Sequence, residues 1–284
     1  MEGLAVIGVV LVLIVVGYVG VSAVLRRIPA TSLRLPTGPI PDTWYAIVER
    51  NVALARGLSS DERERLLRLV QVFLADKHFE GCGGLILTEE MQVTIAAEAS
   101  LLLLHLEGPC YPTLRTVLVY PHGFVPKLAR SPGMGEVAPA PDRLIGESWG
   151  DGVVVISWDD AVRGARNPGD GDNVVLHEFA HQLDEEDGVS DGAPILPPST
   201  LRTWGGVLSE EYERLRRDAA HDRRSALDDY GATNEAEFFA VATETFFEKP
   251  VQLEREHPAL YTQLQQFYRQ DPARRAPPPP APAP

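Results

Sequence analysis

The sequence predicts a mainly helical domain that contains a small sheet, preceded by one apolar helix. Residues 3–25 are uncharged and almost wholly aliphatic, as a membrane-crossing helix requires. Between residues 42 and 271, apolar side chains recur at helical spacing in several segments. Two short runs, 113–120 and 152–158, are instead rich in residues that favour strands. With 44% hydrophobic residues, the chain of 284 can form a packed core.

These observations divide the chain into four parts. Residues 3–25 are the expected transmembrane anchor, and residues 26–41 are a linker that contains several prolines. Residues 42–271 are expected to form one folded domain. Residues 272–284 are rich in proline and alanine, which cannot pack a core, so we expect a disordered tail.

The composition restricts the compartment and the partners. A formal net charge of −14 leaves no basic excess to bind phosphates, which argues against nucleic acid and favours peptide or protein partners. Cys82 and Cys110 are too few for a disulfide scaffold and fit a reducing compartment.

The apolar N-terminal segment predicts the localisation. As a helix, residues 3–25 would be about 34 Å long, against a hydrocarbon core of roughly 30 Å. Arg26 and Arg27 follow directly, which places the rest of the chain in the cytoplasm. A cleaved signal peptide is the alternative, but it needs a basic start, and only Glu2 follows the initiating methionine before the apolar run. We therefore expect a membrane protein with a single N-terminal anchor and a cytoplasmic catalytic domain.

Local signals predict the elements of the domain. Ser59, with Glu62 three residues later, forms a capping box, and Thr88 caps a further helix. Helices are expected over residues 42–56, 59–79, 89–106, 159–166, 173–184, 200–220, 233–248 and 253–269. The two β-rich runs are expected to be neighbours in a sheet. The run 153–158 is a candidate edge strand that holds a peptide as an added strand, and an ordinary core strand fits it equally well.

The segment 173–184, Asn-Val-Val-Leu-His-Glu-Phe-Ala-His-Gln-Leu-Asp, carries the clearest chemical signal. His177 and His181 are four residues apart, so on a helix both imidazoles can reach one metal ion, with Glu178 beside them. Zinc takes neutral nitrogen ligands, and a carboxylate beside its open position can accept a proton from water. The apolar flanks indicate a buried helix rather than a surface helix with a coincidental histidine pair. Glu178 is therefore the expected general base.

A third ligand is expected downstream, and two carboxylates compete for the role. Asp187 is six residues after His181, but the corresponding zinc motif needs a glycine where this chain has Asp184. Glu237 lies in an apolar helical segment, where a carboxylate is costly unless it has a partner such as zinc. Glu237 is favoured, and Asp187 is the alternative. Glu244 lies about two turns, or roughly 10 Å, beyond Glu237, too far to share one set of ligands.

Three features together resemble the MtfA family, zinc peptidases named for the Mlc titration factor. They are the segment 173–184, the strand end Ile-Ser-Trp-Asp at 156–159, and Tyr230, which precedes an Ala-Glu-Phe-Phe-Ala-Val sequence at 236–241. The resemblance covers roughly residues 66–270. It implies an α+β catalytic domain similar to the lethal-factor type of zincin.

The resemblance also implies a gluzincin-like site. One zinc ion would be held by His177, His181 and Glu237, with Glu178 as the base and Tyr230 stabilising the oxyanion. The expected function is hydrolysis of peptide bonds by zinc-activated water in a membrane-anchored peptidase. The choice between aminopeptidase and endopeptidase action stays open. The alternative is a zinc-stabilised, membrane-tethered module that captures a transcriptional regulator as its protein partner.

Overall fold

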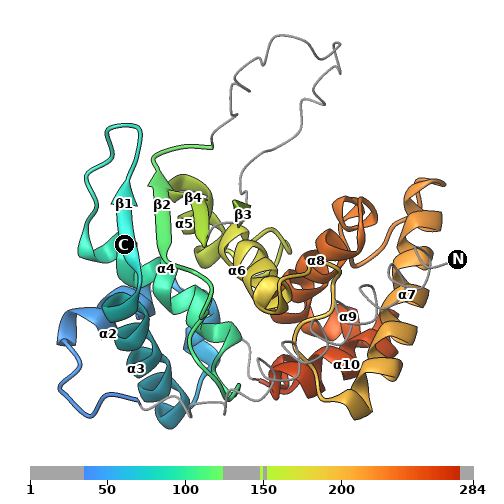
Figure 1. The fold of residues 1–284 in the computed structure, drawn as a ribbon, viewed down its shortest axis with the longest axis horizontal. Coiled ribbons are helices and arrows are strands. Elements are labelled where there is room, and N and C mark those ends of the chain that lie inside the picture. The colour runs from blue at the N-terminus through green and yellow to red at the C-terminus, as the bar shows by residue number, and fades with distance from the viewer. Residues whose placement is uncertain (1–34, 124–147, 150–151, 276–284) are drawn as a thin grey trace, which may run out of the picture. The chain divides into compact units, whose positions relative to one another are not determined.

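A computed structural model describes residues 35–123, 148–149 and 152–275. Of these, residues 35–106 and the described residues from 110 to 275 belong to one compact unit, which holds every element discussed below, and residues 107–109 fall outside it. The unit combines many helices with a small sheet (Figure 1). Its α-helices are α2 (Asp42–Asn51), α3 (Ser60–Asp76), α4 (Glu89–Leu102), α5 (Trp158–Arg166), α6 (Val174–Asp184), α7 (Pro198–Ala219), α8 (Glu235–Glu248), α9 (Pro250–Glu256) and α10 (Pro258–Tyr268). Short 3-10 helices are η1 (Ala53–Gly57), η2 (Glu185–Asp187), η3 (Asp229–Ala232) and η4 (Pro272–Arg274).

The sheet has the strand order β1-β2-β4-β3 and is mostly parallel. Strands β1 (His78–Gly81), β2 (Thr116–Tyr120) and β4 (Val153–Ser157) run parallel, and β3 (Ser148–Trp149) pairs antiparallel with the start of β4. The two β-rich runs are therefore neighbours, as predicted. Strand β4 is an inner strand between β2 and β3, so the expectation that residues 153–158 form the edge strand is wrong. The alternative, a core strand, is confirmed by the complete burial of Val154 and Ile156.

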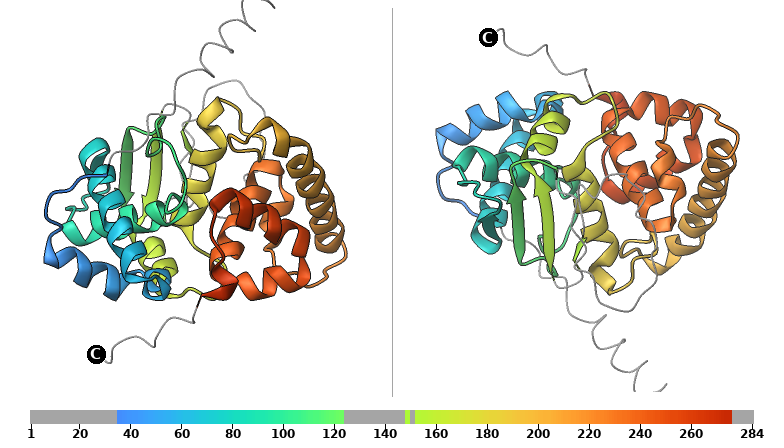
Figure 2. Two further views of the ribbon diagram at one scale, coloured as in Figure 1. Left: turned by 90° about the horizontal axis from the view of Figure 1, so that it is seen from below. Right: turned by 90° about the horizontal axis from the view of Figure 1, so that it is seen from above.

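Helix α6 lies between the sheet, with its covering helices, and the group formed by α7 to α10 (Figures 1 and 2). Its apolar side chains are buried, and Leu176 and Phe179 are fully buried. The Phe179 ring packs against Tyr111 and Phe73, with centroids 4.9 and 5.6 Å apart. The apolar flanks of the motif therefore belong to the core, which excludes the surface-helix alternative.

Several predicted helices have other bounds than expected: α2 ends at Asn51 rather than at residue 56, and α4 ends at Leu102 rather than at residue 106. The helix expected over 59–79 ends at Asp76, because the next residues form β1 and pair with β2. The helix expected over 253–269 is divided into α9 and α10 by Pro258, which cannot continue the preceding helix. The predicted disordered tail also starts too early, because Pro272–Arg274 is helical and Pro272 is buried.

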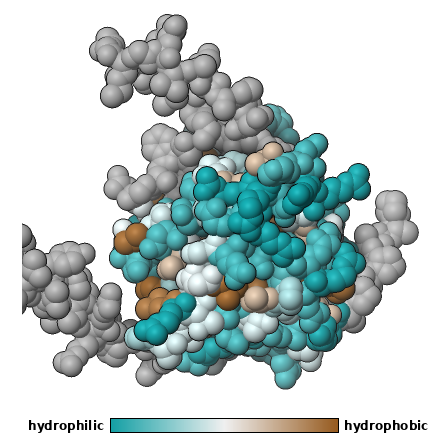
Figure 3. All heavy atoms as spheres, turned by 90° about the vertical axis from the view of Figure 1, so that its right-hand side faces the viewer, coloured by the Kyte–Doolittle hydropathy of each residue, from teal (hydrophilic) through white to brown (hydrophobic). Residues whose placement is uncertain are grey.

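The predicted membrane anchor, residues 3–25, lies outside the described residues. Within residues 35–123, 148–149 and 152–275, no helix combines the length and the apolar character that crossing a membrane requires. Apolar α4 has only 14 residues, and the longest helix, α7 with 22, carries charged residues on its exposed side. The molecular face on that side is mostly hydrophilic (Figure 3). This finding contradicts the predicted single-pass, cytoplasm-facing localisation, and we withdraw that prediction.

Candidate metal centre

Helix α6 brings the two histidines of the motif together. Asn173 caps the helix, with its side-chain Oδ1 accepting a hydrogen bond from the Leu176 amide at 3.0 Å. His177 and His181 then lie one turn apart on the same face, with their Nε2 atoms 3.2 Å apart. Because α6 is buried by the core, the face that carries the histidines is held in one orientation.

Helix α8 places Glu237 against the two histidines. Asn234 caps this helix and accepts a hydrogen bond from the Glu237 amide at 2.9 Å, so Glu237 lies in its first turn. Glu237 Oε2 lies 3.0 Å from His177 Nε2 and 3.4 Å from His181 Nε2. Burial raises the pKa of Glu237, but hydrogen bonds and charge from both histidines outweigh it and lower the pKa to about 2. Glu237 therefore presents an anionic oxygen to the histidine pair.

The spacing of these three atoms fits a zinc ion. In a tetrahedral site with metal–ligand bonds of about 2.0–2.1 Å, neighbouring ligand atoms are roughly 3.3 Å apart. The three separations here are 3.2, 3.0 and 3.4 Å. Two imidazole nitrogens and one carboxylate oxygen are also a known ligand set of catalytic zinc. Among the described residues, His177, His181 and Glu237 form a group that could hold a metal ion.

Asp187, the alternative third ligand, is not part of this group. Asp184 keeps a right-handed helical conformation, with φ −66° and ψ −41°, so the chain does not turn back after α6. The Asp184 carboxylate instead accepts a hydrogen bond from the Gly192 amide at 2.9 Å. Asp187 is exposed and accepts a hydrogen bond from the Val189 amide. Without a glycine at position 184, the segment carries Asp187 away from the histidines.

Glu178 is a buried carboxyl with one oxygen that no protein group contacts by a hydrogen bond among the described residues. Its side chain is 3% exposed, and its Oε2 has no hydrogen-bond partner among the described residues. Burial raises its pKa to about 6, although His177 and His181 act in the opposite direction. Because Glu178 is next to His177 in the sequence, this unpartnered oxygen is available to a group bound beside the histidine pair.

Tyr230 lies at the same site, on η3. Its ring centroid is 5.9 Å from that of His177. Burial, nearby carboxylates and a hydrogen bond with Glu237 raise the pKa of Tyr230 to about 12, so its hydroxyl keeps a proton to donate. Gly231 packs so closely that an added Cβ would lie 3.1 Å from Leu215 Cδ2 and 3.2 Å from Val241 Cβ. This close packing holds Tyr230 beside the ligands.

The sequence reasoning missed the contribution of Glu244. As expected, Glu244 does not join the group of possible ligands, but its Oε1 lies 2.7 Å from Nδ1 of His177. Its separation from Glu237 by seven residues is the signal that could have revealed this role. Seven residues are close to two helical turns, so both carboxylates project from the side of α8 that faces α6.

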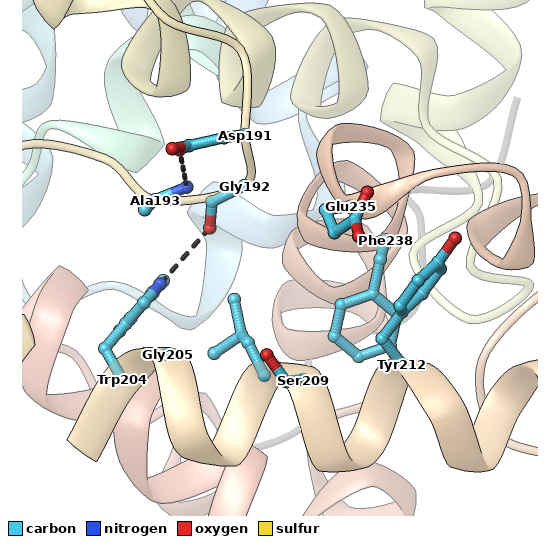
Figure 4. A pocket seen from close by; sticks show the side chains of 10 residues that line it. Asp191, Gly192, Ala193, Trp204, Gly205, Ser209, Tyr212, Glu235 and Phe238 are labelled. Atoms are coloured by element: carbon cyan, nitrogen blue, oxygen red, sulfur yellow. Dashed lines mark hydrogen bonds between the residues drawn. The ribbon is translucent and has the colours of Figure 1, made fainter. Parts of the chain in front are cut away.

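A small pocket lies apart from the metal-binding group. It has a volume of about 70 Å³ and lies between the loop 191–193, α7 and the start of α8 (Figure 4). In that view the Trp204 indole N–H donates to the Gly192 carbonyl oxygen, at 3.2 Å. Glu235 lines the pocket, but it projects about 200° around α8 from Glu237. The pocket and the histidine pair therefore adjoin different sides of α8.

A buried helix with two metal-spaced histidines, a glutamate between them and a carboxylate from a second helix is the arrangement of a metallopeptidase. The family described as glucose-regulated metallo-peptidase M90 matches residues 26–269, and the chain belongs to this family. The resemblance recognised from the motifs is thereby confirmed.

Relatives match over most of their length. An uncharacterized protein of Synechocystis is 39% identical over 233 residues, covering 81% of this chain and 84% of the relative. Mlc titration factor A of Serratia proteamaculans is 33% identical over 227 residues, covering 79% and 86%. Mlc titration factor A of Pectobacterium atrosepticum is 33% identical over 235 residues, covering 82% and 87%.

Proposed function

We propose that this protein is a zinc-dependent peptidase in which His177, His181 and Glu237 hold one zinc ion. The observation that carries the proposal is the triangle of their ligand atoms, with sides of 3.0 to 3.4 Å. Its size is that of one face of a zinc coordination tetrahedron. Membership of a metallopeptidase family supports the same reading and implies peptide substrates.

The residues around the triangle have separate roles in hydrolysis. Zinc, when bound, supplies a Lewis acid and lowers the pKa of water at its open position. Glu178 takes the proton from the attacking water and passes it to the leaving amine. Tyr230 donates a hydrogen bond to the oxygen that becomes negative when the peptide carbonyl is attacked. The burial of Glu178 and the raised pKa of Tyr230 support these assignments.

The proposal extends to the catalytic unit, which comprises residues 42–271 after a linker at 26–41. A gluzincin-like α+β domain similar to the lethal-factor type of zincin fits the donor set and the mixed sheet beside α6. Strand β3 is at the edge of the described sheet, so β3, rather than β4, is the strand beside which a peptide could add.

A second candidate function is a zinc-stabilised module that binds a regulatory protein. The observation in its favour is the name of two relatives, Mlc titration factor, which gives Mlc as what those proteins titrate. A purely structural zinc usually has four protein ligands, and it has no use for an unpartnered buried glutamate such as Glu178. The site chemistry therefore favours the peptidase.

The two candidates are separated by measuring bound zinc and peptide hydrolysis in the full-length protein. We expect one zinc per chain and hydrolysis of unstructured peptides in the wild type. Glu178→Gln should keep the zinc and lose hydrolysis, whereas Glu237→Ala should lose both. Zinc binding without hydrolysis by the wild type would favour the binding module, and hydrolysis by Glu178→Gln would contradict the mechanism.

A further inference from the structure

Three buried glutamates surround Asn173, the residue that caps helix α6. Asn173 is fully buried, and none of the residues Glu98, Glu244 and Glu248 is more than 6% exposed. Glu98 comes from α4, and the other two come from successive turns of α8. Three acidic groups in one buried place are costly unless donors satisfy them, so their partners indicate what the cluster does.

Asn173 uses every one of its hydrogen-bonding groups in this cluster. Its Nδ2 donates to Glu98 Oε1 at 3.0 Å and to Glu248 Oε1 at 3.1 Å. Its backbone amide donates to Glu244 Oε2 at 2.7 Å. Its two oxygens accept from the amides of α6, Oδ1 from Leu176 and the carbonyl from His177. Asn173 thus fastens the start of α6 to both neighbouring helices.

Glu244 links Asn173 to the proposed metal ligands. Its Oε2 accepts from the Asn173 amide, and its Oε1 lies 2.7 Å from His177 Nδ1. The other ring nitrogen of His177, Nε2, faces His181 and Glu237. A carboxylate oxygen at Nδ1 selects the tautomer with hydrogen on Nδ1, which leaves the Nε2 lone pair for a metal. Both oxygens of Glu244 therefore face hydrogen-bond donors. A glutamine at this position would turn its NH₂, itself a donor, towards one of them.

Glu98 offers a matched comparison, because it touches the same Asn173 without reaching a histidine. Its Oε1 accepts from Asn173, and its Oε2 has no partner among the described residues. A glutamine in place of Glu98 can keep its oxygen towards Asn173 and place its NH₂ at the Oε2 position, where it meets no other donor in the part of the chain that the structure describes. Gly164 packs against the same residue, since an added Cβ would lie 3.0 Å from Asn173 Cα. The surroundings of Asn173 are therefore rigid, and changes at Glu98 and Glu244 can be compared directly.

We propose that Asn173 and Glu244 form a positioning pair, in which Glu244 fixes the orientation and tautomer of His177 and the backbone amide of Asn173, held at the capped start of α6, fixes Glu244. The inference rests on the proposed zinc site and adds two residues that set its geometry without binding the metal. Hydrogen-bonded groups behind metal ligands typically change metal affinity by about 10- to 100-fold when removed. We predict that the positioning pair changes zinc affinity by a factor of this size.

The test measures zinc affinity by chelator competition and the visible spectrum of the cobalt-loaded protein for full-length wild type, Glu244→Gln and Glu98→Gln. We expect Glu244→Gln to weaken zinc binding about 10- to 100-fold and to change the cobalt spectrum. Glu98→Gln should leave the affinity and the spectrum unchanged. Asn173→Asp keeps the capping oxygen and the backbone amide that meets Glu244 but loses the Nδ2 donors to Glu98 and Glu248, so we expect it to weaken zinc binding less than Glu244→Gln does.

Equal zinc affinity and equal cobalt spectra in Glu244→Gln and Glu98→Gln would overturn the positioning pair while leaving the zinc site intact. Failure of the wild type to bind zinc would instead overturn the proposed function, and the pair with it. If Glu244→Gln does not fold, nitrogen NMR of the zinc-loaded wild type still decides. We expect a strongly deshielded His177 Nδ1 proton that exchanges slowly with water, as a short hydrogen bond to Glu244 requires, and an Nδ1 proton that exchanges freely would overturn the inference.

Discussion

Two largely buried histidines in this protein make the same contact with a glutamate but have different surroundings. His177 Nδ1 lies 2.7 Å from Glu244 Oε1, and His257 Nδ1 lies 2.7 Å from Glu211 Oε2. The difference is at the other ring nitrogen. His177 Nε2 faces Glu237 and His181, the two other proposed ligands, whereas His257 Nε2 lies 3.4 Å from the Ser225 hydroxyl.

The second cluster is satisfied within the protein. Ser225 Oγ also accepts from the Leu227 amide, and Arg214 contacts both Glu211 and the Glu256 carbonyl. These contacts tie α7 to the junction between α9 and α10. The comparison teaches that a buried histidine–glutamate contact does not by itself define a functional site. The candidate metal centre differs from the second cluster because three possible ligand atoms converge there and because Glu178 Oε2, next to them in the sequence, has no hydrogen-bond partner among the described residues.

Removal of a proposed ligand should give the largest difference between the clusters. Glu237→Ala is expected to weaken zinc binding by more than about 100-fold, because a direct ligand contributes more than the groups behind it. Metal analysis after gel filtration checks this result. Glu235→Ala, on the same helix, is the control and should keep its zinc. Retention of zinc by Glu237→Ala would leave the third ligand unassigned.

Loss of the Tyr230 hydroxyl should affect catalysis but not the metal. For Tyr230→Phe we expect kcat for peptide hydrolysis to fall about 10²- to 10³-fold, with zinc content unchanged, because one oxyanion donor is removed. Tyr261→Phe removes a hydroxyl remote from the histidines, one that contacts Asp271, and should leave kcat unchanged. An unchanged kcat in Tyr230→Phe would exclude the oxyanion role.

Disruption of the second histidine cluster should change stability alone. His257→Ala leaves the buried Glu211 without its main partner, so the free energy of unfolding should fall by about 1–3 kcal/mol. Urea unfolding measures the loss, and zinc affinity is expected to match the wild type. A large loss of zinc affinity would mean that the two clusters are not independent.

The two regions should also differ in how stability depends on pH. Burial raises the pKa of Glu98 to about 8, from an ordinary value of 4.5. The unfolded chain releases this proton above about pH 4.5 while the folded chain retains it, so stability should fall as pH rises towards 8, by up to about 1.4 kcal/mol per pH unit. Glu98→Gln should reduce this decline between pH 5 and 8 in urea unfolding. An identical decline in this variant would show that Glu98 is not protonated in the fold.

For Glu211 the sign is opposite. Burial raises its pKa, but the hydrogen bond and charge of His257, with Arg214, outweigh it and lower the pKa overall. Its contribution to stability is therefore present above the ordinary glutamate pKa and is lost as pH falls below it. Glu211→Gln should weaken the acid-side loss of stability while leaving the decline above pH 5 unchanged.

The candidate metal-binding group could be predicted from sequence because its signals are local. His177 and His181 share one helix, and Glu237 stands out as a carboxylate in an apolar helical run. The same reasoning placed β2 beside β4. Strand β1 was missed because it has only four residues and depends on pairing with a strand more than 30 residues away.

The buried partnerships could not be predicted in this way. Glu211 and His257 are 46 residues apart, and Glu244 meets His177 across 67 residues, so no local pattern connects either pair. In the sequence, all these glutamates resemble residues on solvated helix faces. Only the packing of α6 against α4 and α8, and of α7 against the junction of α9 and α10, reveals which carboxyls are buried and what they contact.

The central claim is that the group at His177, His181 and Glu237 is a catalytic zinc site. The most direct measurement is peptide hydrolysis by the full-length protein before chelation, after complete removal of metal, and after addition of one equivalent of zinc, with Glu178→Gln in parallel. We predict that hydrolysis disappears with the metal, returns with one zinc per chain, and is absent from zinc-loaded Glu178→Gln. Hydrolysis by the metal-free protein, or by Glu178→Gln at the wild-type rate, would contradict the claim.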